Sequence, residues 1–159
     1  MRCVATIIGK SEYADEILME NVYPKISELR AHTSKKSRVS RRKVLFILGM
    51  QSGSPLVAGK AVSADGFISM IGGENSMNDF EGWKPVSTEA IIKASPDIIL
   101  ISNRGLAAVG DKKDLRNHPA LKLTPAARNN EIYAMDGMEM LGFGPRTINA
   151  ALKLSKKIK

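Results

Sequence analysis

The stretch STEAIIKASPDIILIS, residues 87–102, contains a helix signal followed directly by a strand signal. Ser87 or Thr88 can cap a helix, and Glu89 lies in its first turn, where a negative charge is favourable. Pro96 ends this helix, because proline lacks the backbone N–H that a helix interior needs. The apolar run in DIILIS that follows is typical of a strand buried on both faces of a sheet. The stretch therefore predicts a helix that leads into a buried strand.

The same alternation continues on both sides of this stretch. Similar apolar runs occur in KVLFIL and EIYAM, and further helices are expected over about 64–71 and 146–158. Alternating strands and helices predict an α/β fold, with a parallel-rich sheet of about four strands and helices on both faces. The predicted parallel strands are residues 44–48, 98–101 and 131–134.

Residues 1–42 have a different pattern. Apolar residues spaced three and four apart predict a helix over about 11–31, which Pro24 should bend or interrupt. Residues 33–42 are polar and basic, without apolar periodicity, and predict a linker. The chain therefore divides into residues 1–42, a helix with a basic linker, and residues 43–159, an α/β lobe.

Composition limits the classes of protein to which this chain can belong. The chain has 159 residues, enough for one domain with a core, and no apolar run approaches the roughly 18 residues of a membrane span. The first residues lack the basic region and long apolar run of a secretory signal. The single Cys3 permits no intramolecular disulfide. His32 and His118 fit no metal-ligand motif, so we expect both to be solvated surface residues.

Two alternative functions follow from charge and fold class. The net charge is +8, and a basic cluster spans residues 35–43, so a basic nucleic-acid-binding module is one alternative. No aromatic residue is interleaved among these cations, which favours a solvated linker. A Rossmann-like nucleotide-binding enzyme is the other alternative. The segment GMQSGSP is not a phosphate-binding loop, and no nucleophile is paired with a base, so we do not expect an enzyme.

Ligands of open α/β sheets bind where the strands end. In the segment SNRGL, Arg104 follows a predicted strand directly, and a guanidinium fixed there could bind a carboxylate through two hydrogen bonds. The alternative is a surface arginine that closes the loop. Gly105 is expected to let the chain turn away and leave the Arg104 side chain facing the ligand.

Two further segments, GMQSGSP and DGMEMLGFG, are expected as loops at the same ends of the strands. Gln51, Ser52 and Gly53 are polar or small, so their backbone could approach a ligand, although an ordinary loop is an equal alternative. Met138 is the better candidate of the nearby methionines, because methionine adapts to flat apolar ligands. Met135 lies inside the strand pattern and is expected in the core.

Four segments of the chain, taken in their order, carry a resemblance to a known family: SGSPLVAGKAVSADGFISMIGGENSM, FEGWKPVSTEAI, SPDIILISNRGL and YAMDGMEMLGFGPR. In this order they resemble the C-terminal lobe of periplasmic haem-binding proteins of haem ABC importers. These proteins belong to the substrate-binding proteins with a helical backbone, which also include siderophore and cobalamin binders. The resemblance covers residue 44 to the end and, more weakly, the preceding helix. The last two segments favour haem over cobalamin.

The resemblance implies a class III periplasmic binding protein, with two α/β lobes joined by one long helix and the ligand between them. Residues 11–31 would be that helix and residues 43–159 the second lobe, so the first lobe and the export signal are expected outside this chain. It also implies a periplasmic transport component, with haem as transported ligand rather than cofactor. The implied partner is an ABC permease in the inner membrane, and no nucleic acid is expected.

The resemblance also assigns roles to single residues. Arg104 matches the arginine of the family's cleft, which supports a tyrosinate or a haem propionate. Glu89 matches the carboxylate that docks onto arginines of the permease. The family's iron ligand is usually a tyrosine of the first lobe. Because Tyr13, Tyr23 and Tyr133 do not match that position, no metal ligand is expected in this chain.

Overall fold

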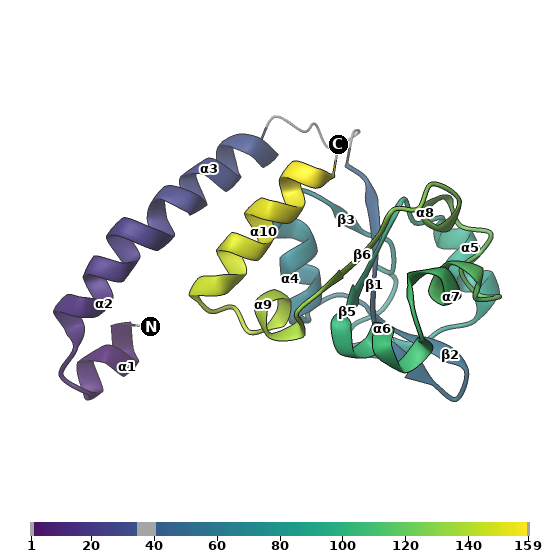
Figure 1. The fold of residues 1–159 in the computed structure, drawn as a ribbon, viewed down its shortest axis with the longest axis horizontal. Coiled ribbons are helices and arrows are strands. Elements are labelled where there is room, and N and C mark those ends of the chain that lie inside the picture. The colour runs from purple at the N-terminus through teal and green to yellow at the C-terminus, as the bar shows by residue number, and fades with distance from the viewer. Residues whose placement is uncertain (1, 35–40, 159) are drawn as a thin grey trace.

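The apolar runs of the sequence form the centre of a six-stranded sheet in the computed structural model, which describes residues 2–34 and 41–158. Strands β1 (Lys43–Gln51), β5 (Ile98–Ser102) and β6 (Ile132–Met135) lie side by side and run parallel (Figure 1). In their register Ile47 pairs with Ile101, which pairs with Ala134. The predicted parallel arrangement of these three strands is therefore confirmed.

The sheet is mixed rather than only parallel-rich, and it has more strands than expected. Strand β2 (Ser54–Ala58) pairs antiparallel with β1, and β4 (Trp83–Pro85) pairs antiparallel with β2. The short β3 (Glu74–Asn75) pairs in parallel with the start of β1. The strand order is β4-β2-β1-β5-β6, with β3 beside β1. The prediction that GMQSGSP forms a loop is wrong, because most of this segment belongs to the β1–β2 hairpin.

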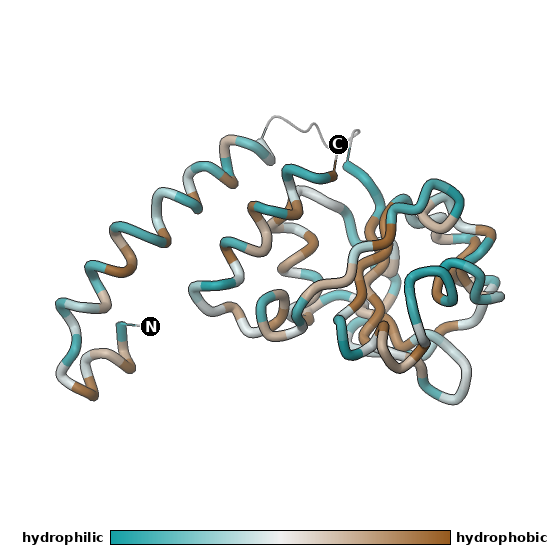
Figure 2. Tube along the Cα trace, in the orientation of Figure 1, coloured by the Kyte–Doolittle hydropathy of each residue, from teal (hydrophilic) through white to brown (hydrophobic). Residues whose placement is uncertain are grey.

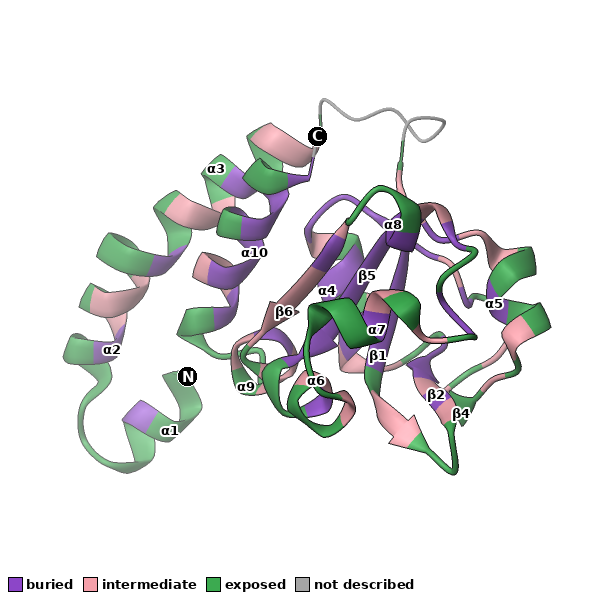
Figure 3. Ribbon diagram, turned by 45° about the vertical axis from the view of Figure 1, so that its right-hand side comes forward, coloured by how far each residue is buried: buried purple, intermediate pink, exposed green. Residues whose placement is uncertain are grey.

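Helices cover both faces of the sheet, as predicted. Side chains of a strand alternate between the faces, so Val44 and Phe46 pack on one side while Leu45 and Ile47 pack on the other, all four fully buried. The first face is covered by α4 (Ser63–Met70), α9 (Gly137–Leu141) and α10 (Pro145–Lys157). The second face is covered by α5 (Thr88–Ala94), α6 (Asn103–Val109), α7 (Lys112–Asn117) and α8 (Pro125–Arg128). Figures 2 and 3 show that hydrophobic and buried residues concentrate in the strands.

A helical arm precedes the lobe. It consists of α1 (Arg2–Ile7), α2 (Ser11–Ile17), the π-helical turn η1 (Leu18–Val22) and α3 (Tyr23–Thr33). The segments from Ser11 onward follow one another without a break, which confirms the predicted long helix. The π-helical turn ends at Val22, and Pro24 occupies the first turn of the following α3, where a missing N–H costs little. Helix α1 was not expected from the sequence.

The arm lies along α10. Leu29 is buried in the core of the first face, and Lys156 forms an ion pair of 2.6 Å with Glu28. His32 Nε2 lies 2.9 Å from the carbonyl oxygen of Ser155. The expectation of a solvated His32 is therefore wrong, because the ring is half-buried between the two helices. The ring of His118 is also engaged, since its Nδ1 accepts the backbone N–H of Ala120 at 3.2 Å.

Most of the predicted basic linker, residues 35–40, lies outside the described residues. At its end, Arg42 is not merely solvated. Its guanidinium donates to the carbonyl oxygen of Asp97 at 3.0 Å and lies 3.4 Å from the carboxylate of Glu131. These two contacts of Arg42 link the start of β1 to the segments that precede β5 and β6.

Candidate functional site

The structure brings the three predicted ligand segments to one edge of the sheet. Because β1, β5 and β6 are parallel, with Ser102 opposite Met135, they end at the same side. There β1 continues into the hairpin, β5 into α6 and β6 into α9. We call this side the carboxyl edge, and it consists of residues 51–54, 102–106 and 136–143. It is the place where open α/β sheets bind ligands.

The first segment is the tip of the β1–β2 hairpin. Gln51 pairs with Ser54, and the two residues between them, Ser52 and Gly53, have φ angles of 49° and 80°. Two successive positive φ angles are the signature of the tight two-residue turns that suit twisted hairpins. Gln51, Ser52 and Gly53 are exposed. They form a projecting hairpin at the edge rather than an open loop.

The second segment holds Arg104 in the first turn of α6, not in a loop as predicted. Ser102 caps this helix by accepting the N–H of Gly105 at 2.9 Å, and its hydroxyl lies 3.4 Å from the carbonyl oxygen of Leu48. A Cβ at Gly105 would lie 2.5 Å from that same carbonyl oxygen. Gly105 is thus needed for close packing of α6 on β1, not for a turn. The Arg104 side chain is exposed at the edge.

The third segment holds Met138 in α9, where a loop was predicted. Asp136 caps α9 by accepting the N–H of Glu139 at 3.0 Å. Met138 is 69% exposed although it is apolar, and Phe143, just beyond the helix, is 50% exposed. A Cβ at Gly137 would lie 3.5 Å from the Cβ of Ser102, so the start of α9 adjoins the start of α6. The edge therefore holds exposed apolar side chains and an exposed arginine.

Met135 is partly buried and packs against the core of the first face. This agrees with its expected role in packing.

The segment that leads to Glu89 lies beside the turn end of the hairpin. The backbone N–H of Val86, just before α5, donates to the carbonyl oxygen of Pro55 in β2 at 3.1 Å. Ser87 caps α5, as predicted, by accepting the N–H of Ala90 at 3.3 Å. Hydrogen bonds from its own backbone N–H and from the Ser87 hydroxyl lower the pKa of Glu89. Its carboxylate is exposed and negatively charged at neutral pH.

The three tyrosines lie outside the three segments of the carboxyl edge, on the arm and in β6. Tyr13 and Tyr23 are exposed on the arm. The Tyr133 hydroxyl donates to the carboxylate of Glu131 at 2.7 Å, on the side of the sheet where Arg42 lies. Burial, together with this hydrogen bond, raises the pKa of Tyr133 to about 12. Tyr133 is therefore a neutral hydrogen-bond donor engaged within the lobe.

The described residues offer neither a metal centre nor a membrane span. Within residues 2–34 and 41–158, no group of three or more His, Cys, Asp and Glu side chains could hold a metal ion. No helix in this part of the chain is long and apolar enough to cross a membrane. What the carboxyl edge can do is bind a ligand that combines an anionic group with an apolar surface.

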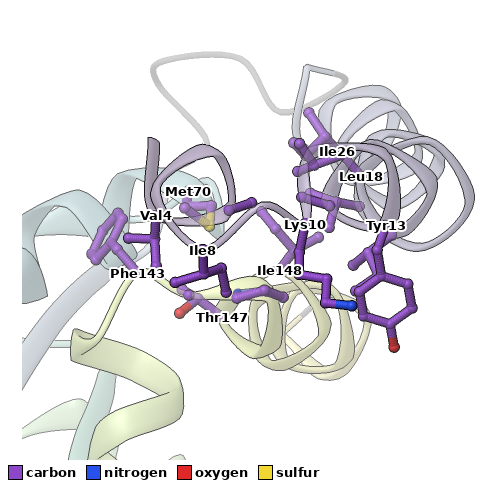
Figure 4. A pocket seen from close by; sticks show the side chains of 16 residues that line it. Val4, Ile8, Lys10, Tyr13, Leu18, Ile26, Met70, Phe143, Thr147 and Ile148 are labelled. Carbon is purple, nitrogen blue, oxygen red and sulfur yellow. The ribbon is translucent and has the colours of Figure 1, made fainter. Parts of the chain in front are cut away.

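A feature that the sequence did not reveal is an apolar groove of about 780 Å³ between the arm and α10 (Figure 4). Residues of α1, α2 and η1 form one wall, while Phe143, Thr147 and Ile148 form the other. Its walls are more than a hundred residues apart in sequence, so no local pattern could have indicated it. Phe143 belongs to both the groove and the carboxyl edge.

Comparison with known proteins identifies the family. Residues 1–138 match the periplasmic binding protein family. This chain belongs to that family. The periplasmic haem-binding protein BhuT, solved with two haems, superimposes with a TM-score of 0.89 and 32% identity over 98% of this chain and 59% of BhuT. The haem-binding protein HutB of Vibrio cholerae gives a TM-score of 0.83 and 32% identity over 98% of this chain and 60% of HutB.

A further relative places the family in transport. The ABC transporter substrate-binding lipoprotein YvrC of Bacillus subtilis strain 168 is 24% identical over 154 residues, 96% of this chain and 48% of YvrC. The chain thus spans about half to three fifths of its relatives, which corresponds to one lobe of a class III periplasmic binding protein. Substrate-binding proteins of this family are not enzymes, in agreement with the sequence-based interpretation.

Proposed function

We propose that this chain is the carboxyl-terminal lobe of the haem-binding component of an ABC importer. In the periplasm it would help to capture haem and deliver it to an inner-membrane permease. The observation that carries the proposal is the carboxyl edge, which holds the exposed Arg104 and exposed apolar side chains, on a lobe 32% identical to the haem-binding proteins BhuT and HutB.

The chemistry of this edge suits haem. Haem carries two propionates and a flat apolar ring. The Arg104 guanidinium can bind a carboxylate through two charge-assisted hydrogen bonds. Met138 and Phe143, both exposed, can lie against the ring. The projecting tip of Gln51, Ser52 and Gly53 would bound the ligand on the side of the hairpin.

This chain supplies no iron ligand in our proposal. Tyr13 and Tyr23 lie on the arm, and the hydroxyl of Tyr133 is engaged with Glu131. We therefore expect the chain alone to bind haem weakly, without the absorption spectrum of a tyrosinate complex. Tight stoichiometric binding with that spectrum, unaffected when all three tyrosines are changed to Phe, would contradict this account of the site.

The proposed ligand is tested by a fusion that joins the amino-terminal lobe of HutB to this chain. Absorbance titrations would follow binding of haem and, separately, of cobalamin. We expect the fusion to bind haem more tightly than this chain or the HutB lobe does alone, and not to bind cobalamin. A fusion that folds but binds cobalamin, or gains no haem affinity over its parts, would refute the proposal.

Glu89 is proposed as the contact with the permease, because it is an exposed carboxylate at a helix start. In cells where the fusion replaces HutB, Glu89→Arg should reduce haem uptake while leaving haem affinity unchanged, since charge complementarity orients docking. Glu81→Arg is the matched control, because Glu81 is an exposed carboxylate at the other end of β4. If Glu89→Arg lowers affinity as much as uptake, Glu89 is a residue of the ligand site instead.

A further inference from the structure

We propose that this lobe recognises the porphyrin ring of haem rather than the metal at its centre, and that Phe143 is the residue that stacks on the ring. The inference rests on the proposed function, because it concerns the same ligand at the same carboxyl edge. Metal-free protoporphyrin, which has the ring and the propionates of haem but no iron, should therefore bind as well.

The backbone of Phe143 is in the left-handed region, with a φ angle of 47°. Bulky side chains rarely adopt this conformation, because the Cβ atom makes it unfavourable. The two neighbours are glycines, which tolerate a positive φ, yet Gly142 and Gly144 have φ angles of −79° and −90°. The unfavourable conformation therefore falls on the aromatic residue. Strained residues of this kind cluster at ligand sites, where the surrounding structure holds them in place.

Helix α4 contacts the Phe143 side chain at the tip of its ring. A Cβ at Gly66 would lie 3.0 Å from the ring atom Cζ, and 3.7 and 3.9 Å from the two Cε atoms. The ring therefore points its tip at Gly66, and the absence of a Cβ there lets it approach α4. Phe143 nevertheless stays 50% exposed. The ring is thus held at one end while part of it remains open to a ligand.

The Phe143 ring continues an apolar surface that begins at Met138. A Cβ at Gly142 would lie 3.6 Å from the methyl carbon of Met138, so the Met138 side chain reaches the residue before Phe143. Met138 is itself 69% exposed. Aromatic rings stack on flat π-systems with an offset, and the flexible methionine side chain adapts to the same surfaces. The two side chains together are suited to contact a planar macrocycle.

The carboxyl edge is poor in groups that hold haem iron. Residues 51–54, 102–106 and 136–143 include no histidine, cysteine or tyrosine. Met138 has a thioether, but in cytochromes methionine holds the iron together with a histidine. We therefore expect the contacts of this lobe to reach the ring and its propionates, which are the same in haem and in metal-free protoporphyrin.

The test uses the fusion with the amino-terminal lobe of HutB and two probes, haem and metal-free protoporphyrin IX. Absorbance and fluorescence titrations would measure the dissociation constant of each probe, and we expect both to bind. Phe143→Ser should weaken both by the same factor, about five- to fiftyfold, because one stacking contact is lost. A residue that acted through the iron would change the value for haem alone.

Leu123→Ser is the matched control for Phe143→Ser. Leu123 is 48% exposed in the turn before α8, outside the carboxyl edge. We expect it to change either dissociation constant less than about twofold. Met138→Leu removes the sulfur but keeps an apolar side chain, so it should leave the ratio of the two dissociation constants unchanged.

Gly66→Ala tests the contact at the tip of the ring while Phe143 stays in place. The added methyl group would lie so close to the ring that the ring must shift. We expect both probes to bind about two- to fivefold more weakly, with no loss of helix in the circular dichroism spectrum, since alanine favours a helix more than glycine does. Ser69→Ala, at an exposed position of the same helix, is the control and should have no effect.

Three outcomes would overturn the proposal: a fusion that binds haem but not metal-free protoporphyrin, a Phe143→Ser variant that weakens haem alone, or equal effects of Phe143→Ser and Leu123→Ser. A loss of haem affinity alone in Met138→Leu would also overturn it, because this lobe would then supply an iron ligand. In each of these cases the parent fusion still binds haem, so the proposed function stands. A fusion that gains no haem affinity over its parts would refute the proposed function and this inference together, so the two failures are distinguishable.

Discussion

The lobe and the arm differ in how they bury their apolar side chains. In the lobe, Ile99 and its neighbours in β5 are almost fully buried, between helices that cover both faces of the sheet. In the described part of the arm, the apolar residues that are fully buried are Ala5, Ala14, Val22 and Leu29, whereas Ile7 is 84% exposed. The lobe is therefore held by its own core, while the arm depends on its contacts with α10.

The largest expected effect separates the two regions by stability. Ile99→Ala should lower the free energy of unfolding by about 2–5 kcal/mol, because it leaves a cavity in a core that cannot collapse around it. Ile92→Ala in α5, where the side chain is 38% exposed, should cost less than about 1 kcal/mol. Denaturant titrations would measure both. Similar losses in the two variants would mean that the core of the second face is not the main support of the lobe.

A smaller effect is expected at the junction of the arm and the lobe. Leu29 is 4% exposed in the core of the first face, so Leu29→Ala should release α3 from α10. Amide hydrogen exchange in α3 should become faster, while exchange in β5 stays unchanged. Met19→Ala, an exposed position of the arm, is the control. Equal acceleration in β5 would show that the arm and the lobe unfold as one unit, which would contradict the difference in support described for the two regions.

The elements that are predictable from the sequence follow the same division. The three parallel strands were predictable because runs such as those around Phe46 and Ile99 are apolar without interruption, and this occurs where both faces of a strand are covered. The hairpin was missed because Gln51, Ser52 and Gly53 break the apolar run. The Ser-Gly pair is itself a turn signal, which could have predicted the tight turn.

The candidate site was predicted in part. The order of strands was enough to place Arg104 and Met138 at one edge, but both were expected in loops. Ser102 and Asp136 are helix-capping residues, and Glu139 stands three positions after Asp136, a pattern that could have indicated α6 and α9. The groove was not predictable, because it exists only after α1 and α10 have come together.

The next effect is the pH dependence of stability, and it is smaller because it involves one tyrosine side chain. The pKa of Tyr133 is raised to about 12, mainly by burial and further by Glu131, whereas an unfolded tyrosine titrates near about 10. A raised pKa means that the neutral hydroxyl stabilises the fold below pH 10, and that this contribution is lost between about pH 10 and about pH 12. The free energy of unfolding should therefore fall less in Tyr133→Phe than in the parent between about pH 9.5 and about pH 11.5. An identical fall in both proteins would show that the fold does not raise the pKa of Tyr133.

The smallest effect on stability, and the most direct test of the proposed haem site, belongs to Arg104. In the fusion with the HutB amino-terminal lobe, we expect Arg104→Ala to weaken haem binding about ten- to a hundredfold, the equivalent of a charge-assisted hydrogen bond. Lysine should restore only part of this loss, because it lacks the planar fork of the guanidinium. Stability should change by less than about 0.5 kcal/mol, since the side chain is exposed.

Arg128→Ala is the matched control, an exposed arginine that ends α8, just before β6 begins and so at the opposite edge of the sheet from Arg104. The deciding measurement is the haem dissociation constant of the parent fusion and of these two variants, obtained by absorbance titration. Our account predicts a loss for Arg104→Ala and none for Arg128→Ala. Equal haem affinity in the Arg104→Ala variant and the parent would contradict the assignment of the carboxyl edge as the haem site.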